Sequence, residues 1–139
     1  MHKAASLIAL ASVFIAAPIV GKSALPPGTG VLCMGGLLYF AEDVAATCHA
    51  GQHPDFQARL SAYTDRFDAY IARNMDGGED ALQSFKAGQG VGSGDAKYLC
   101  SGSPASFYED VRTAKAEEID AAIDELLAVD GPPIFGDCL

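Results

Sequence analysis

Four cysteines constrain the fold of this chain more than any other feature of its sequence. They are Cys33, Cys48, Cys100 and Cys138, and none of them forms the C-x-x-C motif that is common in metal and haem sites. An even number of cysteines in a short exported domain indicates two disulfide bonds. The helices predicted between the cysteines then limit which of them can meet.

The N-terminal segment has the pattern of an export signal. Lys3 precedes an apolar run over residues 4–17, and small residues suited to cleavage follow at positions 21–24. We therefore predict a signal peptide over residues 1–24 and one exported domain, periplasmic or secreted, over residues 25–139. An uncleaved membrane anchor is the alternative. It is less favoured because the apolar run is short and is followed by proline and glycine.

The spacing of apolar residues predicts helices throughout the mature domain. Phe56, Leu60, Tyr63, Phe67 and Tyr70 form the clearest stripe at helical spacing. The predicted helices cover residues 35–49, 54–74, 79–86 and 107–129, with another helical turn near residues 95–100. No stretch shows the alternation typical of strands. We expect an all-α fold, a small up-down bundle of three main helices and one short helix, stapled by two disulfides.

Local signals support some of these boundaries. Pro54 stands in the first turn of the second helix, where proline is tolerated. Ser106 followed by Glu109 has the spacing of a capping box, which places the start of the last helix at this point. Residues 131–133, Gly-Pro-Pro, end it.

Helix length decides the expected disulfide pairing. A helix between Cys33 and Cys48 would hold them about 20 Å apart, whereas a disulfide requires Cα atoms within about 7 Å. In an up-down bundle, Cys48 meets Cys100 at one end and Cys33 meets Cys138 at the other. The alternative, Cys33 with Cys100 and Cys48 with Cys138, requires the last helix to run in the opposite direction.

The charge of the chain excludes some partners. The formal net charge is −9, with 18 acidic and 9 basic residues, and removal of Lys3 and Lys22 with the leader makes it more negative. Nucleic acid and anionic membranes repel such a chain. We therefore expect another exported protein as partner, one that is basic, with no nucleic acid and no stable membrane anchor after cleavage.

A run of acids in the last predicted helix is the candidate partner-binding surface. No basic residue interrupts it, and most of it falls near the helix C-terminus, where the dipole disfavours negative charge. A basic partner would offset this cost, whereas a solvated face that keeps the protein soluble is the alternative explanation. The acids are Glu117, Glu118, Asp120, Asp124, Glu125 and Asp130.

Other motifs have features of binding sites, but their surroundings favour structural roles. His49 and His53 have the H-x-x-x-H spacing of zinc ligands, but Gly51 and Pro54 interrupt the helix that would align them. Residues 88–94 (GQGVGSG) follow no strand, so a flexible linker is favoured over a phosphate-binding loop. The acids at positions 76, 79 and 80 lack the spacing of an EF-hand. We expect no metal and no cofactor.

The arrangement Cys33-x-Gly35, helix, Cys48, second amphipathic helix resembles that of bacterial periplasmic immunity proteins. The resemblance covers the first two predicted helices, and it implies a helical, disulfide-bonded inhibitor of a toxic enzyme. The chain contains no G-x-S-x-G motif and no unpaired cysteine as nucleophile. We expect a non-enzymatic protein-binding domain, for example an inhibitor or immunity-type protein. A carrier of a small ligand or metal ion that uses the aromatic interior is the alternative.

Overall fold

The computed structural model describes residues 25–138, which form helices and no strand. The predicted all-helical class is confirmed, and the predicted signal peptide lies outside the described residues. The six helices are α1 (Val31–Cys48), α2 (Pro54–Asn74), α3 (Gly78–Gly88), α4 (Ala96–Leu99), α5 (Gly102–Thr113) and α6 (Ala116–Leu126).

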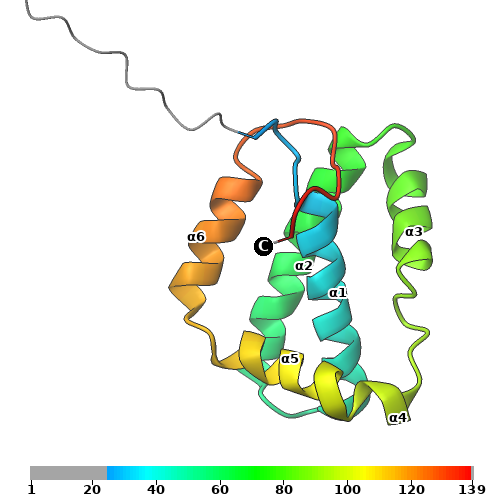
Figure 1. The fold of residues 1–139 in the computed structure, drawn as a ribbon, viewed down its shortest axis with the longest axis vertical. Coiled ribbons are helices and arrows are strands. Elements are labelled where there is room, and N and C mark those ends of the chain that lie inside the picture. The colour runs from blue at the N-terminus through cyan, green and yellow to red at the C-terminus, as the bar shows by residue number, and fades with distance from the viewer. Residues whose placement is uncertain (1–24, 139) are drawn as a thin grey trace, which may run out of the picture.

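The helices α1 and α2 form an antiparallel pair at the centre of the molecule (Figure 1). The second helix has the predicted bounds. The first begins at Val31, four residues earlier than predicted, after Gly30 adopts a positive φ of 86°. Among residues 25–138, only α1 is long and apolar enough to cross a membrane. Core helices share this composition, and eight residues of α1 are buried in this fold.

A glycine brings the two central helices close together. A Cβ atom added at Gly35 of α1 would lie 3.2 Å from Cδ1 of Phe67, whose side chain is fully buried in α2. The neighbouring Gly36 faces outward, and its added Cβ would meet only the flexible side chain of Gln89. The sequence Gly35-Gly36 therefore combines one packing glycine with one that is not required for packing.

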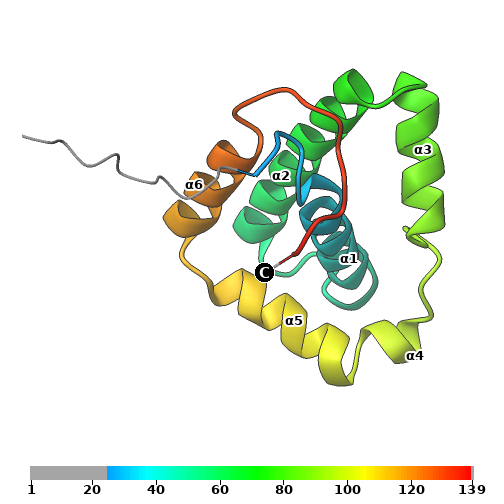
Figure 2. The same ribbon diagram turned by 45° about the horizontal axis from the view of Figure 1, so that its top comes forward.

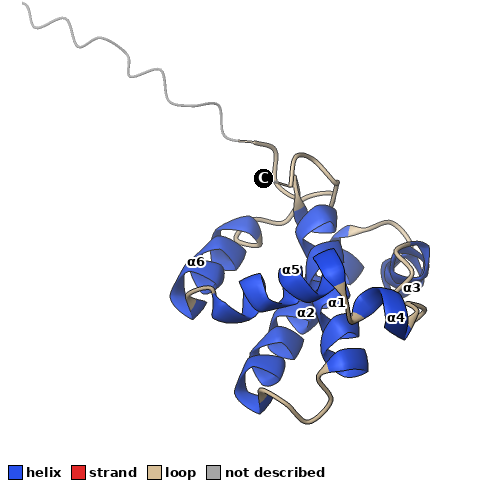
Figure 3. Ribbon diagram, turned by 60° about the horizontal axis from the view of Figure 1, so that its bottom comes forward, coloured by secondary structure: helices blue, strands red, loops and turns tan. Residues whose placement is uncertain are grey.

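The remaining helices surround this pair on three sides. The helix α3 lies along one side, with Leu82 buried and Phe85 partly buried against the core. The short helix α4 leads into α5, which crosses the end of the pair near Cys48 (Figures 2 and 3). There, Tyr108 of α5 is fully buried and packs edge-on against Phe56 of α2 at a ring-centroid distance of 5.4 Å.

The predicted long last helix, residues 107–129, is wrong, as is the capping box at Ser106. The helix α5 starts at Gly102, so Ser106 lies within it, and the extended residues Ala114 and Lys115 separate α5 from α6. One straight helix over residues 102–126 would be about 37 Å long. It would be unable to cross the end of the central pair and also run beside α2, as α5 and α6 together do. This break replaces the simple up-down path expected from the sequence.

Both cysteine pairs lie at disulfide distance, in the pairing expected from the sequence. The Cα atoms are 5.5 Å apart for Cys33 and Cys138 and 5.4 Å apart for Cys48 and Cys100. Each pair fixes a segment of the chain to one end of α1. The route differs from the expected one, because α5 crosses the molecule before α6 returns to the other end.

The two ends of the described chain meet beside the Cys33–Cys138 pair. The backbone N–H of Gly30 donates to the carbonyl oxygen of Ile134 at 3.1 Å, and that of Ile134 donates to Gly28 at 3.0 Å. The hydroxyl group of Tyr70 donates to the carbonyl oxygen of Val129 at 2.9 Å. The C-terminal tail is therefore bound to both the N-terminal lead-in and α2.

We predict that Gly36→Ala gives a more stable protein than Gly35→Ala. Alanine improves helix propensity by about 1 kcal/mol at both positions, but at Gly35 the added methyl group overpacks the contact with Phe67, which typically costs 1–3 kcal/mol. Urea unfolding of the two variants and the wild type measures the difference. Equal stability of the two variants would show that the close approach at Gly35 does not constrain the fold.

Candidate functional site

The acidic run lies on α6 and the loop after it, beside arginines of α2. Arg66 forms an ion pair with Asp124 at 2.6 Å, and Arg73 forms one with Asp130 at 2.7 Å. The side-chain amide of Asn74 also donates to Asp130, at 3.0 Å. Because α2 and α6 run in the same direction, acids and arginines meet in the same order along both segments. Two of the six predicted partner-binding acids therefore have a basic partner from another helix of this chain.

The position of α6 changes the dipole argument made from the sequence. Glu117 and Glu118 lie in its first turn, where the helix dipole favours negative charge, and Glu118 also pairs with Lys115 at 2.9 Å. Only Asp124 and Glu125 lie in its last turn. The sequence predicted a cluster of acids near the C-terminus of one long helix. That prediction was wrong because the helix that carries them, α6, starts at Ala116. Glu117, Asp120 and Glu125 form no ion pair within the described chain.

The ion pair with Arg73 has a measurable consequence for Asp130. The guanidinium of Arg73, and then the amide of Asn74, hold the pKa of the Asp130 carboxyl below its ordinary value of 3.8. The pair is exposed to solvent, and exposed ion pairs contribute little to stability. Burial of Ile123, which is 2% exposed, therefore does more to hold α6 in place than the charges do.

A second polar network joins the three helices α1, α2 and α3. Asp68 accepts hydrogen bonds from the hydroxyl group of Tyr39 at 2.5 Å and from the ammonium group of Lys86 at 2.8 Å. The ammonium nitrogen of Lys86 also lies 4.7 Å from the centroid of the Tyr39 ring. Burial, and then the hydrogen bond to Asp68, raise the pKa of Tyr39. Both oxygens of Asp68 are thus occupied, and this network links the helices rather than presenting a free charge.

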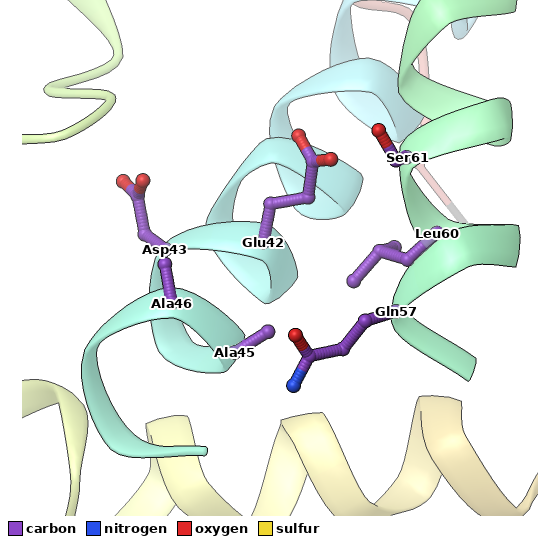
Figure 4. A pocket seen from close by; sticks show the side chains of 7 residues that line it. All are labelled: Glu42, Asp43, Ala45, Ala46, Gln57, Leu60 and Ser61. Atoms are coloured by element: carbon purple, nitrogen blue, oxygen red, sulfur yellow. The ribbon is translucent and has the colours of Figure 1, made fainter. Parts of the chain in front are cut away.

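A surface groove of about 360 Å³ lies between α1 and α2, towards their Cys48 end. None of its residues was among the candidate site residues expected from the sequence. Figure 4 shows Glu42 and Ser61 extending towards each other from opposite helices, with Gln57 below them, while Asp43 turns away at the rim. The lining residues are Glu42, Asp43, Ala45, Ala46, Gln57, Leu60 and Ser61.

The polar groups of this groove are mainly hydrogen-bond acceptors. The side-chain nitrogen of Gln57 donates to the carbonyl oxygens of His49 at 2.8 Å and Gln52 at 2.7 Å, which leaves its Oε1 as an acceptor. One oxygen of Asp43 accepts from the backbone N–H of Gly92 at 2.8 Å. Glu42 has neither a hydrogen bond nor an ion pair at standard geometry among the described residues.

Burial raises the pKa of the Glu42 carboxyl above its ordinary value of 4.5. The nearby Thr64 hydroxyl and the Lys86 ammonium oppose this rise, and the carboxylates of Asp65 and Asp68 add to it. The hydroxyl group of Thr64 donates a hydrogen bond to the carbonyl oxygen of Ser61 at 3.0 Å. Lys86 forms an ion pair with Asp68. Glu42 is therefore a partly buried carboxylate whose neighbours are engaged elsewhere.

The two histidines considered as zinc ligands form part of an aromatic cluster. The ring of His49 stacks on that of Tyr108 at 4.3 Å, and the rings of His49 and His53 lie 5.9 Å apart. Cys48, which precedes His49 in the sequence, is paired with Cys100. Within the part of the chain that the structure describes, no three His, Cys, Asp or Glu side chains are grouped as a metal site.

No family model, curated protein or solved structure matches this chain.

We predict that Arg73→Met raises the pKa of Asp130 towards 3.8. A carboxyl with a lowered pKa stabilises the fold above its ordinary pKa, and this contribution is lost as the pH falls through its lower folded value. Wild-type stability should therefore decrease more steeply than that of the variant below about pH 4. Carbon-detected NMR titration of the carboxyl measures the shift. Arg66→Met is the matched control, because Arg66 pairs with Asp124, and an equal shift in both variants would contradict the assignment.

We predict that Glu42→Gln stabilises the protein at neutral pH. A carboxyl with a raised pKa in the folded state lowers stability as the pH rises from about 4.5 through that folded value, and glutamine removes this penalty. The advantage should shrink at pH 4. Urea unfolding at both pH values measures it, with Glu79→Gln on the exposed surface of α3 as control. A variant that is less stable than the wild type at pH 7 would show that Glu42 is stabilised in the fold.

Proposed function

We propose that this protein is an exported, non-enzymatic binding domain that recognises a basic protein partner, for example as an inhibitor or immunity-type protein. The observation that carries the proposal is the excess of acids left after internal pairing. Five ion pairs within residues 25–138 use only five of the 18 acidic residues. The remaining carboxylates belong to a fold in which two cysteine pairs hold other segments to the two ends of α1.

Export is supported by the cysteines and by the N-terminal sequence. Two pairs at disulfide distance are typical of proteins that fold in an oxidising compartment. The apolar segment over residues 4–17 has the length and flanking residues of a signal peptide. Together they favour a periplasmic or secreted protein.

The aromatic residues considered for a ligand carrier have a packing role. Phe67 and Tyr70 are 0% and 1% exposed, and Phe56 and Tyr63 are each 5% exposed. All four belong to the core cluster that joins α2 to its neighbours. The geometry therefore favours recognition at the surface over storage of a ligand among these rings.

We predict that expression of the full chain in a bacterial host yields an exported protein cut near Ser23 or Ala24, with no free thiol. Intact-mass analysis after alkylation under non-reducing conditions measures both properties. A form that lacks residues 1–24 and is made in the cytoplasm is the control, and its thiols should react. An exported protein that retains Lys3, or that reacts with the alkylating reagent, would contradict the proposal.

The partner is tested by capture on the immobilised mature protein. From the envelope fraction of the source cells, we expect a protein of high isoelectric point that is retained in low salt and released in high salt, because salt screens exposed charges. A column that carries an unrelated protein of similar negative charge would control for ion exchange. A captured partner that is acidic, or that persists unchanged in high salt, would overturn the acidic recognition mechanism.

A further inference from the structure

Half of the acidic run is already engaged within this chain. On α6 and its loop, Asp124, Asp130 and Glu118 are already paired with basic groups of this chain. The groove between α1 and α2 is lined by the Glu42 carboxylate and the Ser61 hydroxyl, which lie near each other, and by Gln57 below them (Figure 4). Glu117, Asp120 and Glu125 of α6 are unpaired, but only the groove combines a carboxylate with an amide oxygen that hydrogen bonds hold in place. We therefore take the groove as the candidate for contact with a cation.

We propose that this groove binds the side chain of a lysine residue from the basic partner protein. The ammonium group would lie between Glu42, Gln57 and Ser61, and its methylene stem would lie on Ala45 and Leu60. This inference depends on the proposed function and assigns the place where the partner binds.

The chemistry of the lining selects a lysine. An ammonium group carries three donors and no acceptor, which matches the three oxygen-bearing groups that α1 and α2 contribute. An arginine guanidinium is a planar fork that pairs best with both oxygens of one carboxylate, so it would use its fork on Glu42 alone, whereas the three donors of an ammonium group suit the carboxylate, the amide oxygen and the hydroxyl together. Long basic side chains also bury their methylene groups against apolar surface, and Ala45, Ala46 and Leu60 supply such a surface.

The state of each groove residue without a partner supports the same conclusion. Gln57 is held by two carbonyl acceptors, so its Oε1 is fixed in place before binding. The nearest cation, Lys86, is bound to Asp68 and lies over the ring of Tyr39, so it is not free to neutralise Glu42. A bound ammonium group would provide the opposite charge that this partly buried carboxylate lacks.

The probe for the test is lysine blocked at both its amino and carboxyl groups. In ¹⁵N–¹H NMR titrations of the mature protein, we expect the largest shifts at Glu42, Ala45, Ala46 and Ser61. Glu42→Gln should weaken binding about tenfold, the usual effect of losing a hydrogen bond to a charged group. Glu79→Gln, the same chemical change on α3, should leave affinity unchanged. The Nε-acetylated probe, which lacks the charge, should not bind, and blocked arginine should bind more weakly.

The rival location is the unpaired acids of α6, tested with Glu117→Gln. If blocked lysine shifts residues of α6, or if Glu117→Gln weakens binding and Glu42→Gln does not, the groove assignment is overturned while recognition of a basic partner stands. Equal binding of the Nε-acetylated probe would also overturn it. Failure of the proposed function itself is recognised separately, by a captured partner that is acidic or insensitive to salt.

Discussion

Both cysteine pairs include a residue near an end of α1, and this shared attachment determines how the rest of the chain is arranged. Cys33 fixes the C-terminal tail to the start of the helix, and Cys48 fixes the segment before α5 to its end. Between these points, α1 packs against α2 closely enough that Gly35 leaves room for Phe67. The chain must return to Cys48 at Cys100 and to Cys33 at Cys138. These two returns constrain where the helices between them lie.

The sequence predicts those parts of the fold in which one helix carries one continuous apolar stripe. The bounds of α2 follow from its aromatic spacing and from Pro54, and the cysteine pairing follows from the length of α1. The break at Ala114 and Lys115 could not be found in this way, because apolar residues continue at helical spacing on both sides of it. It arises from tertiary packing, since Tyr108 is buried across the end of the central pair and Ile123 is buried beside α2.

The candidate site shows the same limit of sequence reasoning. A run of acids is visible in the sequence, but the arginines that pair with part of it lie on α2, more than fifty positions away. The groove residues carry no motif, because Glu42 and Ser61 meet only when α1 and α2 pack. The one available signal was Glu42 itself, a charged residue four positions after buried Leu38 and three before buried Ala45. Its place on the inner side of the helix set it apart from the solvated acids.

The meeting of the two chain ends places both of them at the same end of the central helix α1. The lead-in and the tail are hydrogen-bonded to each other at the Cys33 end of α1, whereas Ala45 of the groove lies about 18 Å further along that helix. An affinity tag or a solid support joined to either end of the described chain would therefore start from the Cys33 end of α1. Such an attachment would lie at the opposite end of α1 from the groove residues Ala45 and Ala46.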